Sequence, residues 1–484
     1  MAEFDLVIKD GTVVTAADTV RCDVGIRSGR IVSLGESLEG SSAQIIDASG
    51  MFVLPGGIDA HCHLEQESPN GLRHADDFYS GSRSAAGGGT TTIIPFANQK
   101  RGASLRAIVN DYHEKAKKAV IDYAFHLIIC APDEQTIGQE LPSLIRDGYT
   151  SFKVFMSYDA LRLGDRQILE LLALAKLEGA LVMVHAENHD CITWLTERLR
   201  TLGQTDPRFH AVAHSMVGER EATHRAIALA EVAEAPILIV HVSGKEAMEE
   251  IQRAQMRGVP VLAETCPQYL FLTDNDLDRS GFEGAKFVCS PPPRTKVDQS
   301  SLWRGLSNGV FQIFSSDHAP YRFDDPNGKM KHGRSATFEH IPNGVPGLET
   351  RLPLLFSSGV QEGRISINQF VALTSTNPAK IYGLYPRKGT IAVGVDADIA
   401  IWDPSRQVTI NHGMLHDNMD YTPYEGTVVN GWPVLTISRG EVVCRDGDVT
   451  TDRGRGRFLP CDLPQISGRA NQPKSDPNKF PLAN

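Results

Sequence analysis

The sequence lacks any long hydrophobic run. None of its apolar stretches approaches the roughly 20 residues that span a bilayer, so we expect no membrane partner. It also lacks a basic surplus, because 59 acidic residues against 48 basic ones give a net charge of −11, which disfavours a nucleic-acid partner. The first residues, MAEFDLVIKDG, carry acids and lack the apolar segment of a secretory signal.

The eight cysteines lack the CxxC or framework spacing of zinc modules and disulfide-rich domains. We therefore expect reduced thiols in a cytoplasmic protein, several of them buried in strands. Cys62 lies between two histidines of an expected strand, so its side chain should point away from them into the core. The rest of the composition, 41% hydrophobic and 22% charged over 484 residues, allows one large core and a second small domain.

Short apolar runs alternate with amphipathic stretches through the middle of the chain. Residues 165–178 and 245–257 are amphipathic stretches with helical periodicity. Alternation of strands and helices indicates a parallel sheet, and eight repeats indicate an α/β fold of the closed (β/α)8 barrel type. The expected strands are Ile58–His63, Thr91–Phe96, Tyr123–Cys130, Ser151–Met156, Ala180–His185, Pro236–Val242, Val259–Thr265 and Gln312–Ser316.

Both ends of the chain are rich in β-branched residues. Residues 4–54 hold short runs joined by Asp10-Gly11, Ser28-Gly29 and Ser49-Gly50, which are dipeptides typical of hairpins. A second β-rich block lies within 389–447, and neither block is large enough to be a domain alone. We expect them to pair into one small β-sandwich domain built from both chain ends. The predicted boundaries are 1–54 and 386–460 for the β-sandwich, 55–385 for the catalytic barrel and 461–484 for a tail.

Residue types that bind metals fall at the carboxyl ends of the expected barrel strands, where such barrels hold their chemistry. His61 and His63 share a face of the strand in PGGIDAHCHLE. His185 ends VMVH, His241 ends LIVH, and Asp317 follows FSS. Taken singly, each histidine could be a satisfied polar end of a core strand and Asp317 could cap a turn. A barrel would bring all five together, which favours a divalent-metal site.

Lys153 lies inside the expected strand SFKVFM, where a buried unpaired ammonium is costly. It must be paired, neutralised or modified. Four neutral imidazoles and one carboxylate would also leave two divalent ions short of negative charge. Uptake of CO2 as a carbamate would turn Lys153 into an anionic bridge between two ions and would meet both needs.

Motifs spread over nearly the whole chain resemble the dihydropyrimidinase and D-hydantoinase family within the amidohydrolase superfamily. They include PGGIDAHCHLE, FKVFMSY, VHAEN, IVHVSG, ETCPQYLFLT, VCSPPPR, SSDHAP and IPNGVPGLE. The resemblance implies a binuclear-metal hydrolase that opens the cyclic amide C–N bond of dihydropyrimidines or 5-substituted hydantoins to N-carbamoyl amino acids. It also implies a small cyclic amide or ureide as substrate and a homotetramer.

The resemblance assigns two divalent ions, zinc in this family, to two sites joined by a carboxylated lysine. The lysine is Lys153, present as N6-carboxylysine. The remaining ligands are His61, His63 and Asp317 for one ion, and His185 and His241 for the other.

Three further positions match substrate contacts of the family. Tyr158 corresponds to the tyrosine that stabilises the oxyanion, and Ser290 and Asn343 to residues whose backbone groups hold the ring amide. Asp317 would take a proton from the attacking hydroxide and pass it to the leaving ring nitrogen. The simpler alternatives are an aromatic residue of the barrel rim for Tyr158 and turn residues for the other two.

Two loops depart from the family pattern and bear on substrate choice. They are QESPNGLRHA (66–75), polar where an apolar lid is expected, and DALRLGD (159–165). Glu65 stands where dihydroorotases carry an arginine, which disfavours an acidic ring. The alternative activity is allantoinase-type ureide hydrolysis. The alternative from another class is a non-catalytic dihydropyrimidinase-related assembly protein, but such proteins lack ligand residues that this chain has.

Other histidines lie near strand ends or in loops, and we expect them not to be ligands: His126, His189, His318 and His332. Of these, we expect His318 to line the site. The tail, 461–484, is rich in Pro, Asn, Ser and Lys and has no periodicity. In relatives this segment often packs on a neighbouring subunit.

Overall fold

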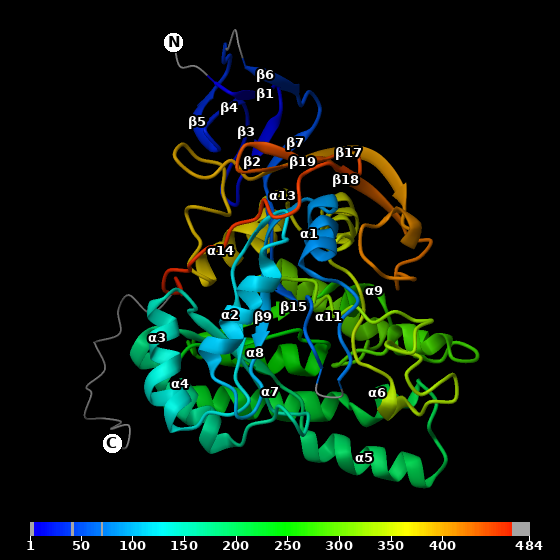
Figure 1. Cartoon of the computed structure of the whole chain (residues 1–484). Helices are drawn as coiled ribbons and strands as arrows, with labels where there is room; N and C mark the ends of the chain where they lie inside the picture. The colour runs from blue at the N-terminus through cyan, green and yellow to red at the C-terminus, as the bar shows by residue number, and fades with distance from the viewer. Residues whose placement is uncertain (1–3, 40–42, 69–70, 467–484) are drawn as a thin grey trace.

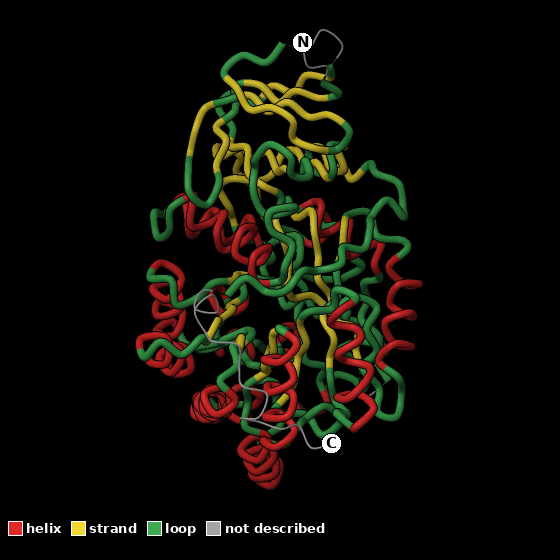
Figure 2. Tube along the Cα trace, turned by 90° about the vertical axis from the view of Figure 1, so that its left-hand side faces the viewer, coloured by secondary structure: helices red, strands yellow, loops and turns green. Residues whose placement is uncertain are grey.

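The computed structural model describes residues 4–39, 43–68 and 71–466. Two sheets of the β-sandwich lie at one end of the molecule, and a barrel of strands surrounded by helices forms the rest (Figure 1). Viewed from the side, the sandwich strands stack above the layer of helices that encloses the barrel (Figure 2). Of the predicted tail, only residues 461–466 are described, and 467–484 lie outside the described residues.

Parallel strands form the barrel wall at the eight predicted positions, the third of which is split in two. The strands are β8 (Gly57–Cys62), β9 (Thr90–Asn98), β10 (Asp122–Tyr123), β11 (His126–Ile128), β12 (Ser151–Phe155), β13 (Leu181–His185), β14 (Ile237–Ile239), β15 (Val261–Thr265) and β16 (Ile313–Phe314). β8 pairs with β9, both halves of the split strand, β10 and β11, pair with β9, and from β11 to β16 the strands pair in chain order. The ring is completed between its first and last strands by a parallel bridge of Cys62 with His318. The predicted (β/α)8 barrel is therefore confirmed.

Helices cover the outside of the barrel, so its strands are buried on both faces and read as continuous apolar runs. In β13 all five residues are buried. The predicted helices are present as α4 (Asp165–Glu178) and α8 (Lys245–Met256). In α4, Ile168, Leu171 and Ala175 face the core, and Gly179 ends the helix with a left-handed φ of 85°.

The other α-helices are α1 (Phe78–Gly87), α2 (Leu105–Ala116), α3 (Leu141–Arg146), α5 (His189–Thr201), α6 (Phe209–Ala213), α7 (Met216–Ala233), α9 (Pro267–Phe271), α10 (Asp274–Leu277), α11 (Lys296–Ser307), α12 (Arg351–Leu355), α13 (Ile367–Val371) and α14 (Asn377–Ile381). Short 3-10 helices are η2 (Glu283–Phe287), η3 (Phe338–His340) and η6 (His412–Met414), and π-helical turns are η1 (Thr136–Glu140), η4 (Phe356–Gln361) and η5 (Ala372–Thr376).

The two chain ends meet in the β-sandwich, as predicted. One sheet has the order β5-β4-β1-β6 and the other β20-β19-β18-β17-β7-β2-β3. In the second sheet β7 of the N-terminal part pairs antiparallel with β17 of the C-terminal part, with Leu54 opposite Ala400. Residues such as Ile8, Val24 and Ile437 form a core of their own between the sheets.

The sandwich strands are β1 (Leu6–Lys9), β2 (Thr12–Val14), β3 (Thr19–Arg21), β4 (Asp23–Arg27), β5 (Arg30–Gly35), β6 (Gln44–Asp47), β7 (Phe52–Pro55), β17 (Ile399–Thr409), β18 (Val428–Ser438), β19 (Glu441–Arg445) and β20 (Asp448–Val449).

Only one of the three predicted hairpin turns joins paired strands. Ser28 and Gly29 have φ values of 51° and 76°, as a tight hairpin turn requires, and connect β4 to β5. At Asp10-Gly11 and Ser49-Gly50 the chain instead passes from one sheet to the other, since β1 and β6 pair in one sheet and β2 and β7 in the other. The hairpin prediction was wrong there because a turn dipeptide indicates a change of direction, not the sheet that the next strand joins.

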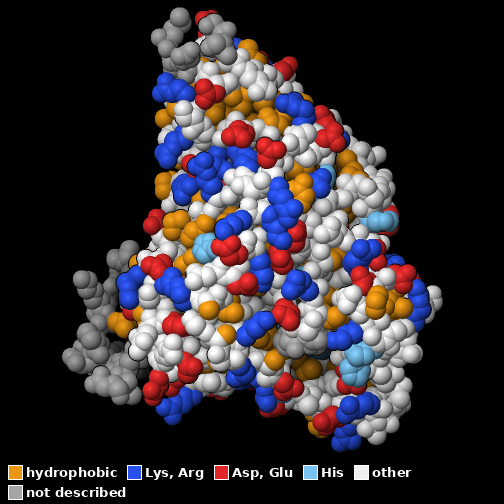
Figure 3. Space-filling view, viewed as in Figure 1, with side chains coloured by type: hydrophobic (Ala, Val, Ile, Leu, Met, Phe, Trp, Pro, Cys, Tyr) orange, Lys and Arg blue, Asp and Glu red, His pale blue; other side chains and the backbone are white. Residues whose placement is uncertain are grey.

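The surface and the cysteines agree with the composition. No helix within the described residues has the length and apolar character needed to cross a membrane. On the face shown in Figure 3, Lys and Arg side chains are interspersed with Asp and Glu. The eight cysteines are all free, and six are buried. Cys62 belongs to the main hydrophobic core, as predicted.

Candidate metal centre and active-site cavity

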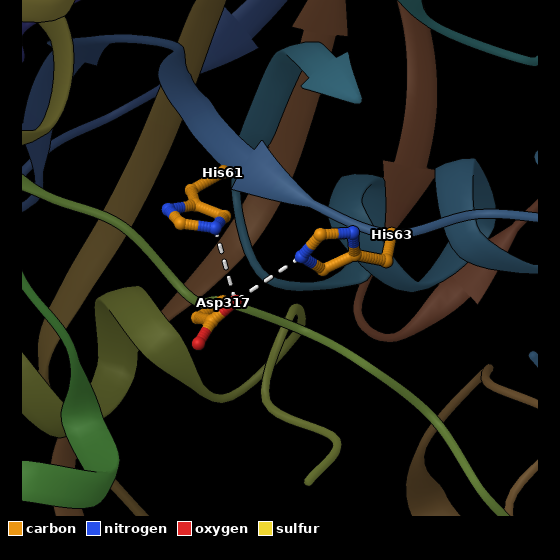
Figure 4. A group of neighbouring side chains, drawn as sticks. All are labelled: His61, His63 and Asp317. Atoms are coloured by element: carbon orange, nitrogen blue, oxygen red, sulfur yellow. Dashed lines mark ion pairs between the residues drawn. The ribbon is translucent and has the colours of Figure 1, made fainter. Parts of the chain in front are cut away.

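Two histidines and an aspartate meet at the carboxyl end of β8 (Figure 4). The Nε2 atoms of His61 and His63 lie 3.1 and 3.3 Å from the same oxygen, Oδ1 of Asp317. Donor atoms of the three side chains all lie within 4.8 Å of one another. Two imidazoles and a carboxylate at this spacing fit a divalent ion such as Zn²⁺.

Lys153 of β12 reaches the same point. Its Nζ lies 2.9 Å from Nε2 of His61 and 4.7 and 4.9 Å from the ring centres of Phe96 and Phe155. These neighbours are imidazole and aromatic rings rather than a paired carboxylate. Burial lowers the pKa of Lys153 to about 8, so an appreciable fraction of the amine is uncharged near neutral pH.

His185 and His241 lie side by side at the ends of β13 and β14. Nδ1 of His185 is 2.8 Å from Nε2 of His241, so the two nitrogens face each other. The ring of His241 is 5.5 Å from that of His61, centre to centre. The strand ends thus bring all six predicted metal-binding residues into one region.

Polar side chains behind the histidines select which ring nitrogen faces the centre. Each of these side chains accepts a hydrogen bond from the ring nitrogen that points away from the centre. The other ring nitrogen then directs its lone pair toward the centre, where an ion would bind. The pairs are His61 with Glu264 (2.6 Å), His63 with Gln66 (2.7 Å) and His185 with Glu187 (2.9 Å). The sequence analysis missed these partners. Glu187 could have been suspected from VHAEN, but Glu264 is 203 residues from His61 and carries no local signal.

Burial keeps most of these imidazoles neutral, which is the form that binds metals. It lowers the pKa of His63 to about 4 and also lowers the pKa values of His185 and His241. Among these histidines only Nδ1 of His241 is buried without a hydrogen-bond partner in the described part of the chain. Neutral ring nitrogens crowded together in a dry interior are costly, and a bound cation relieves that cost.

His61 and Asp317 are coupled through their contact. Burial and Lys153 lower the pKa of His61, but the carboxylates of Glu264 and Asp317 outweigh them and raise it. Burial alone would raise the pKa of Asp317, but His61 and the other histidines hold it well below its usual range. Asp317 is therefore a carboxylate anion at neutral pH.

Three of the site residues have left-handed backbone conformations that are rare for non-glycine residues. The φ angles are 68° at Tyr158, 40° at His241 and 48° at Asp317. Each lies two or three residues beyond a strand end, where the chain turns over the barrel. Such conformations cost about 1–3 kcal/mol each and cluster at functional sites, where the surrounding structure maintains them.

A cavity of about 520 Å³ opens over this centre. Its lining includes His63, Lys153, His185, His241 and Asp317, together with all three predicted substrate residues, Tyr158, Ser290 and Asn343. Nδ2 of Asn343 donates to the Tyr158 hydroxyl at 3.4 Å. Burial raises the pKa of Tyr158, so its hydroxyl keeps the proton that an oxyanion would accept as a hydrogen bond.

Both loops that depart from the family pattern contribute to the cavity wall. Gln66, Ser68 and His74 come from the first, of which residues 69 and 70 lie outside the described residues, and Asp159 to Leu161 come from the second. A neighbouring cavity of about 370 Å³ shares Tyr158 and Asn343 with the first. The space is therefore larger than a bare ring needs, and its wall mixes polar side chains with apolar ones such as Phe155, Leu161 and Ile341.

The remaining histidines differ in place. Both ring nitrogens of His126 are engaged, by Oγ of Ser151 at 2.6 Å and a backbone carbonyl at 3.0 Å. His318 does not line the cavity, contrary to our prediction. It follows Asp317 and points the opposite way, where Nε2 meets Asp76 at 3.0 Å. His332 lines the cavity instead.

Comparison with known proteins shows that the chain is similar in sequence and in fold to amidohydrolases. The profile of the Amidohydrolase family matches residues 52–443. D-hydantoinases of Ralstonia pickettii and Rhizobium radiobacter are 47% and 46% identical to this chain, in each case over 94% of it and 98% of the relative. The crystal structure of dihydropyrimidinase from Brevibacillus agri NCHU1002 superposes with a TM-score of 0.92 at 45% identity, covering 95% of this chain and 99% of that one. The barrel, its metal-binding donors and these similarities together show that the chain belongs to the amidohydrolase family.

Proposed function

We propose that the protein hydrolyses the cyclic amide bond of 5-substituted hydantoins or dihydropyrimidines to N-carbamoyl amino acids. One observation carries this proposal: the metal-binding donors and the three expected ring contacts line a single cavity of about 520 Å³. The names of the relatives, D-hydantoinase and dihydropyrimidinase, support the substrate class. The size of the cavity favours a ring that carries a substituent.

We further propose two divalent ions, zinc by analogy with the family, joined by carboxylated Lys153. His61, His63 and Asp317 would hold one ion, and His185 and His241 the other. When bound, the ions would polarise the amide carbonyl and lower the pKa of water toward neutrality. The proposal is supported by the lowered pKa of Lys153, since CO2 reacts with the uncharged amine, and by the 2.8 Å approach of the His185 and His241 nitrogens.

The side chains then have distinct roles in the reaction. Asp317, an anion in its surroundings, would accept the proton of the attacking hydroxide and deliver it to the leaving ring nitrogen. The Tyr158 hydroxyl would donate to the carbonyl oxygen as negative charge develops there, an effect typically worth about 3–4 kcal/mol per donor. Backbone groups of Ser290 and Asn343 would hold the ring amide in register with these groups.

Other expectations from the sequence complete the proposal. The boundaries 1–54 with 386–460 for the sandwich and 55–385 for the barrel are retained. A homotetramer, with the tail packed on a neighbouring subunit, rests on the family resemblance. A cytoplasmic location rests on the reduced cysteines.

A hydrolysis panel tests the function. Metal-replete protein is given dihydrouracil, dihydrothymine, hydantoin, phenylhydantoin, allantoin and dihydroorotate, and the N-carbamoyl product is quantified. We expect turnover of hydantoins or dihydropyrimidines and little turnover of dihydroorotate, because no arginine among the described residues lines the cavity to pair with its carboxylate. Lys153→Ala, prepared in parallel, controls for contaminating activity. Turnover of allantoin alone would refute the proposal. So would a protein that holds two ions per subunit and hydrolyses none of these rings.

A further inference from the structure

Another fully buried lysine lies behind the cavity, outside the expected ligand set. Lys329 is 0% exposed, and its Nζ donates to three backbone carbonyl oxygens, at 2.9 Å to Val288, 2.6 Å to Pro342 and 2.8 Å to Gly344. These bonds use all three N–H groups of an ammonium. Burial lowers the pKa of Lys329 to about 7 and no described carboxylate offsets this, so the three peptide dipoles, not an ion pair, are what favours the ammonium form.

The three carbonyls flank the two residues that are expected to hold the ring. Val288 lies two positions before Ser290, and the other two carbonyls belong to the residues on either side of Asn343. The backbone N–H of Gly344 also donates to the Val288 carbonyl at 3.0 Å. Ser290 and Asn343 both line the cavity. Lys329 thus connects two segments that are far apart in the sequence but adjacent at the cavity wall.

The segment that carries Lys329 is itself held firmly. The backbone N–H of Lys329 donates to the Arg322 carbonyl at 2.8 Å, which closes a compact loop. A Cβ atom on Gly328 would lie 2.1 Å from that same carbonyl oxygen, so this position requires glycine. The N–H of Phe323 donates to Oδ1 of Asp420 at 2.7 Å. The ammonium is therefore presented from a fixed loop.

We propose that Lys329 is a positioning residue that sets the spacing between the two backbone segments that bind the ring amide. The inference rests on the proposed function. Without the ammonium, three buried carbonyls would lose a charge-assisted donor and the two segments would separate or reorient. Binding of the substrate ring would then have to order the two segments, and this ordering costs binding free energy. The loss should therefore weaken substrate binding more than it slows bond cleavage.

The test compares variants that remove the donors in steps. Lys329→Gln keeps two N–H donors without the charge, and Lys329→Met keeps none. Lys286→Met is the matched control: Lys286 lies in the neighbouring η2, is partly exposed, pairs with Glu283 and lies over the Phe323 ring, but donates to none of the three carbonyls. We expect KM to rise at least tenfold in Lys329→Met and by less in Lys329→Gln. In both variants kcat should stay within about threefold of wild type and the metal content should be unchanged.

A second measurement separates positioning from a general loss of structure. Binding constants are measured by calorimetry for hydantoin and for its two N-methyl derivatives. Lys329→Met should weaken the binding of hydantoin at least fivefold. It should hardly change the binding of the derivative whose methyl group replaces the N–H held by the two segments, because the methyl group and the substitution remove the same interaction. If Lys329 had only a structural role, Lys329→Met would weaken the binding of all three ligands equally.

Three results would overturn the inference: an unchanged KM in Lys329→Met with its metals retained, equal weakening of all three ligands, or parallel losses of kcat and thermal stability. If Lys329→Met does not fold, Lys329→Gln carries the same comparison. If the wild type hydrolyses no ring, the proposed function fails, and the binding constants still decide the role of Lys329. A wild type that binds none of the rings refutes both.

Discussion

Two lysines of this protein, each only 2% exposed, lie in regions of opposite character. Lys388, at the junction of the barrel and the sandwich, pairs with Asp122 at 2.8 Å, with Asp396 at 3.2 Å and with Asp398. Burial alone would lower its pKa, but these carboxylates outweigh burial and raise it. Lys153, at the barrel end, contacts imidazole and aromatic rings, and burial lowers its pKa to about 8.

The comparison separates a structural cation from a reactive amine. A buried lysine surrounded by carboxylates stays charged and contributes to the specificity of the fold. A buried lysine that has neither a paired carboxylate nor a set of backbone carbonyls around its ammonium gives up its proton readily, and a group perturbed in this way within a cavity is a candidate for function. Changes at the barrel end should therefore affect chemistry while the fold persists, and changes at the junction should do the reverse.

The largest effect should come from Lys153→Ala. Loss of the proposed bridge should lower activity by roughly 10³-fold or more, because water would no longer be activated, and metal content per subunit should fall. A short carboxylic acid added in solution should partly restore both by replacing the missing carboxylate. Activity assays with metal analysis by mass spectrometry provide the measurement. If Lys153→Ala retained two ions per subunit and full turnover, Lys153 would not be the bridge.

Tyr158→Phe should come next. Removal of a single oxyanion donor should lower kcat by about tenfold to a thousandfold, while metal content and melting temperature remain those of the wild type. Steady-state kinetics and a thermal melt give both quantities. A near-normal kcat would remove Tyr158 from the mechanism, and a large loss of stability would make it a structural residue of the rim.

The pH dependence of reactivation sharpens the contrast between the two lysines. In metal-stripped protein at fixed dissolved CO2, the recovery rate on addition of metal should rise about tenfold per pH unit below pH 8 and level off above it. The reason is that the uncharged fraction of Lys153 saturates there, whereas a solvated lysine would titrate at about 10.4. The recovery of activity is followed over time after dilution into metal and CO2. A rate that keeps rising beyond pH 9 would contradict the lowered pKa.

At the junction, Lys388→Met should act on stability alone. Three carboxylates would lose the lysine they share; Asp122 and Asp396 would keep Arg439 and Arg387, but Asp398 would lose its ion-pair partner. Removal of one partner from a buried ion pair typically costs about 3–5 kcal/mol. We expect a melting temperature lower by several degrees, with kcat per folded, metal-loaded molecule within about twofold of wild type. Calorimetry gives the melting temperature and steady-state kinetics on the same sample give kcat. Unchanged stability with lost activity would reverse the roles assigned to the two regions.

The smallest effect should come from Asp417, a half-buried acid that forms no ion pair among the described residues and is in that sense the mirror image of Lys153. Burial, with the nearby Asp76, raises its pKa to about 7. Because the native carboxyl keeps its proton up to about pH 7 and the unfolded one only to about 3.9, stability is lost as pH rises between these values. Asp417→Asn keeps an oxygen for the N–H of Met419 and removes the charge.

We therefore expect Asp417→Asn to raise the melting temperature by a few degrees at pH 8 and by less at pH 5. Thermal melts of variant and wild type at the two pH values provide the measurement. Equal gains at both pH values would mean that the effect is not electrostatic.

Much of this organisation is encoded locally and could be predicted. The eight barrel strands are short apolar runs between amphipathic helices, so their positions follow from the periodicity of neighbouring residues. The histidines at strand ends follow from the same pattern. Sheet membership is not local, which is why Ser28-Gly29 forms the predicted hairpin while Asp10-Gly11 leads into the other sheet.

The supporting partners of the site could not be predicted from the sequence for a physical reason. Glu264 meets His61 across 203 residues, and no short-range pattern specifies that contact. Lys329 binds main-chain carbonyls, which every residue possesses, so its partners leave no trace in side-chain identity. His318 was misplaced because the chain turns at Asp317 and sends the next side chain behind the centre.

The most direct test of the bridged metal centre is a crystal structure of the metal-saturated protein grown in the presence of CO2. We predict a carboxylated Lys153 in contact with two ions, one held by His61, His63 and Asp317 and the other by His185 and His241. Electron density for an unmodified amine at Lys153, with one ion or none beside it, would contradict the proposal.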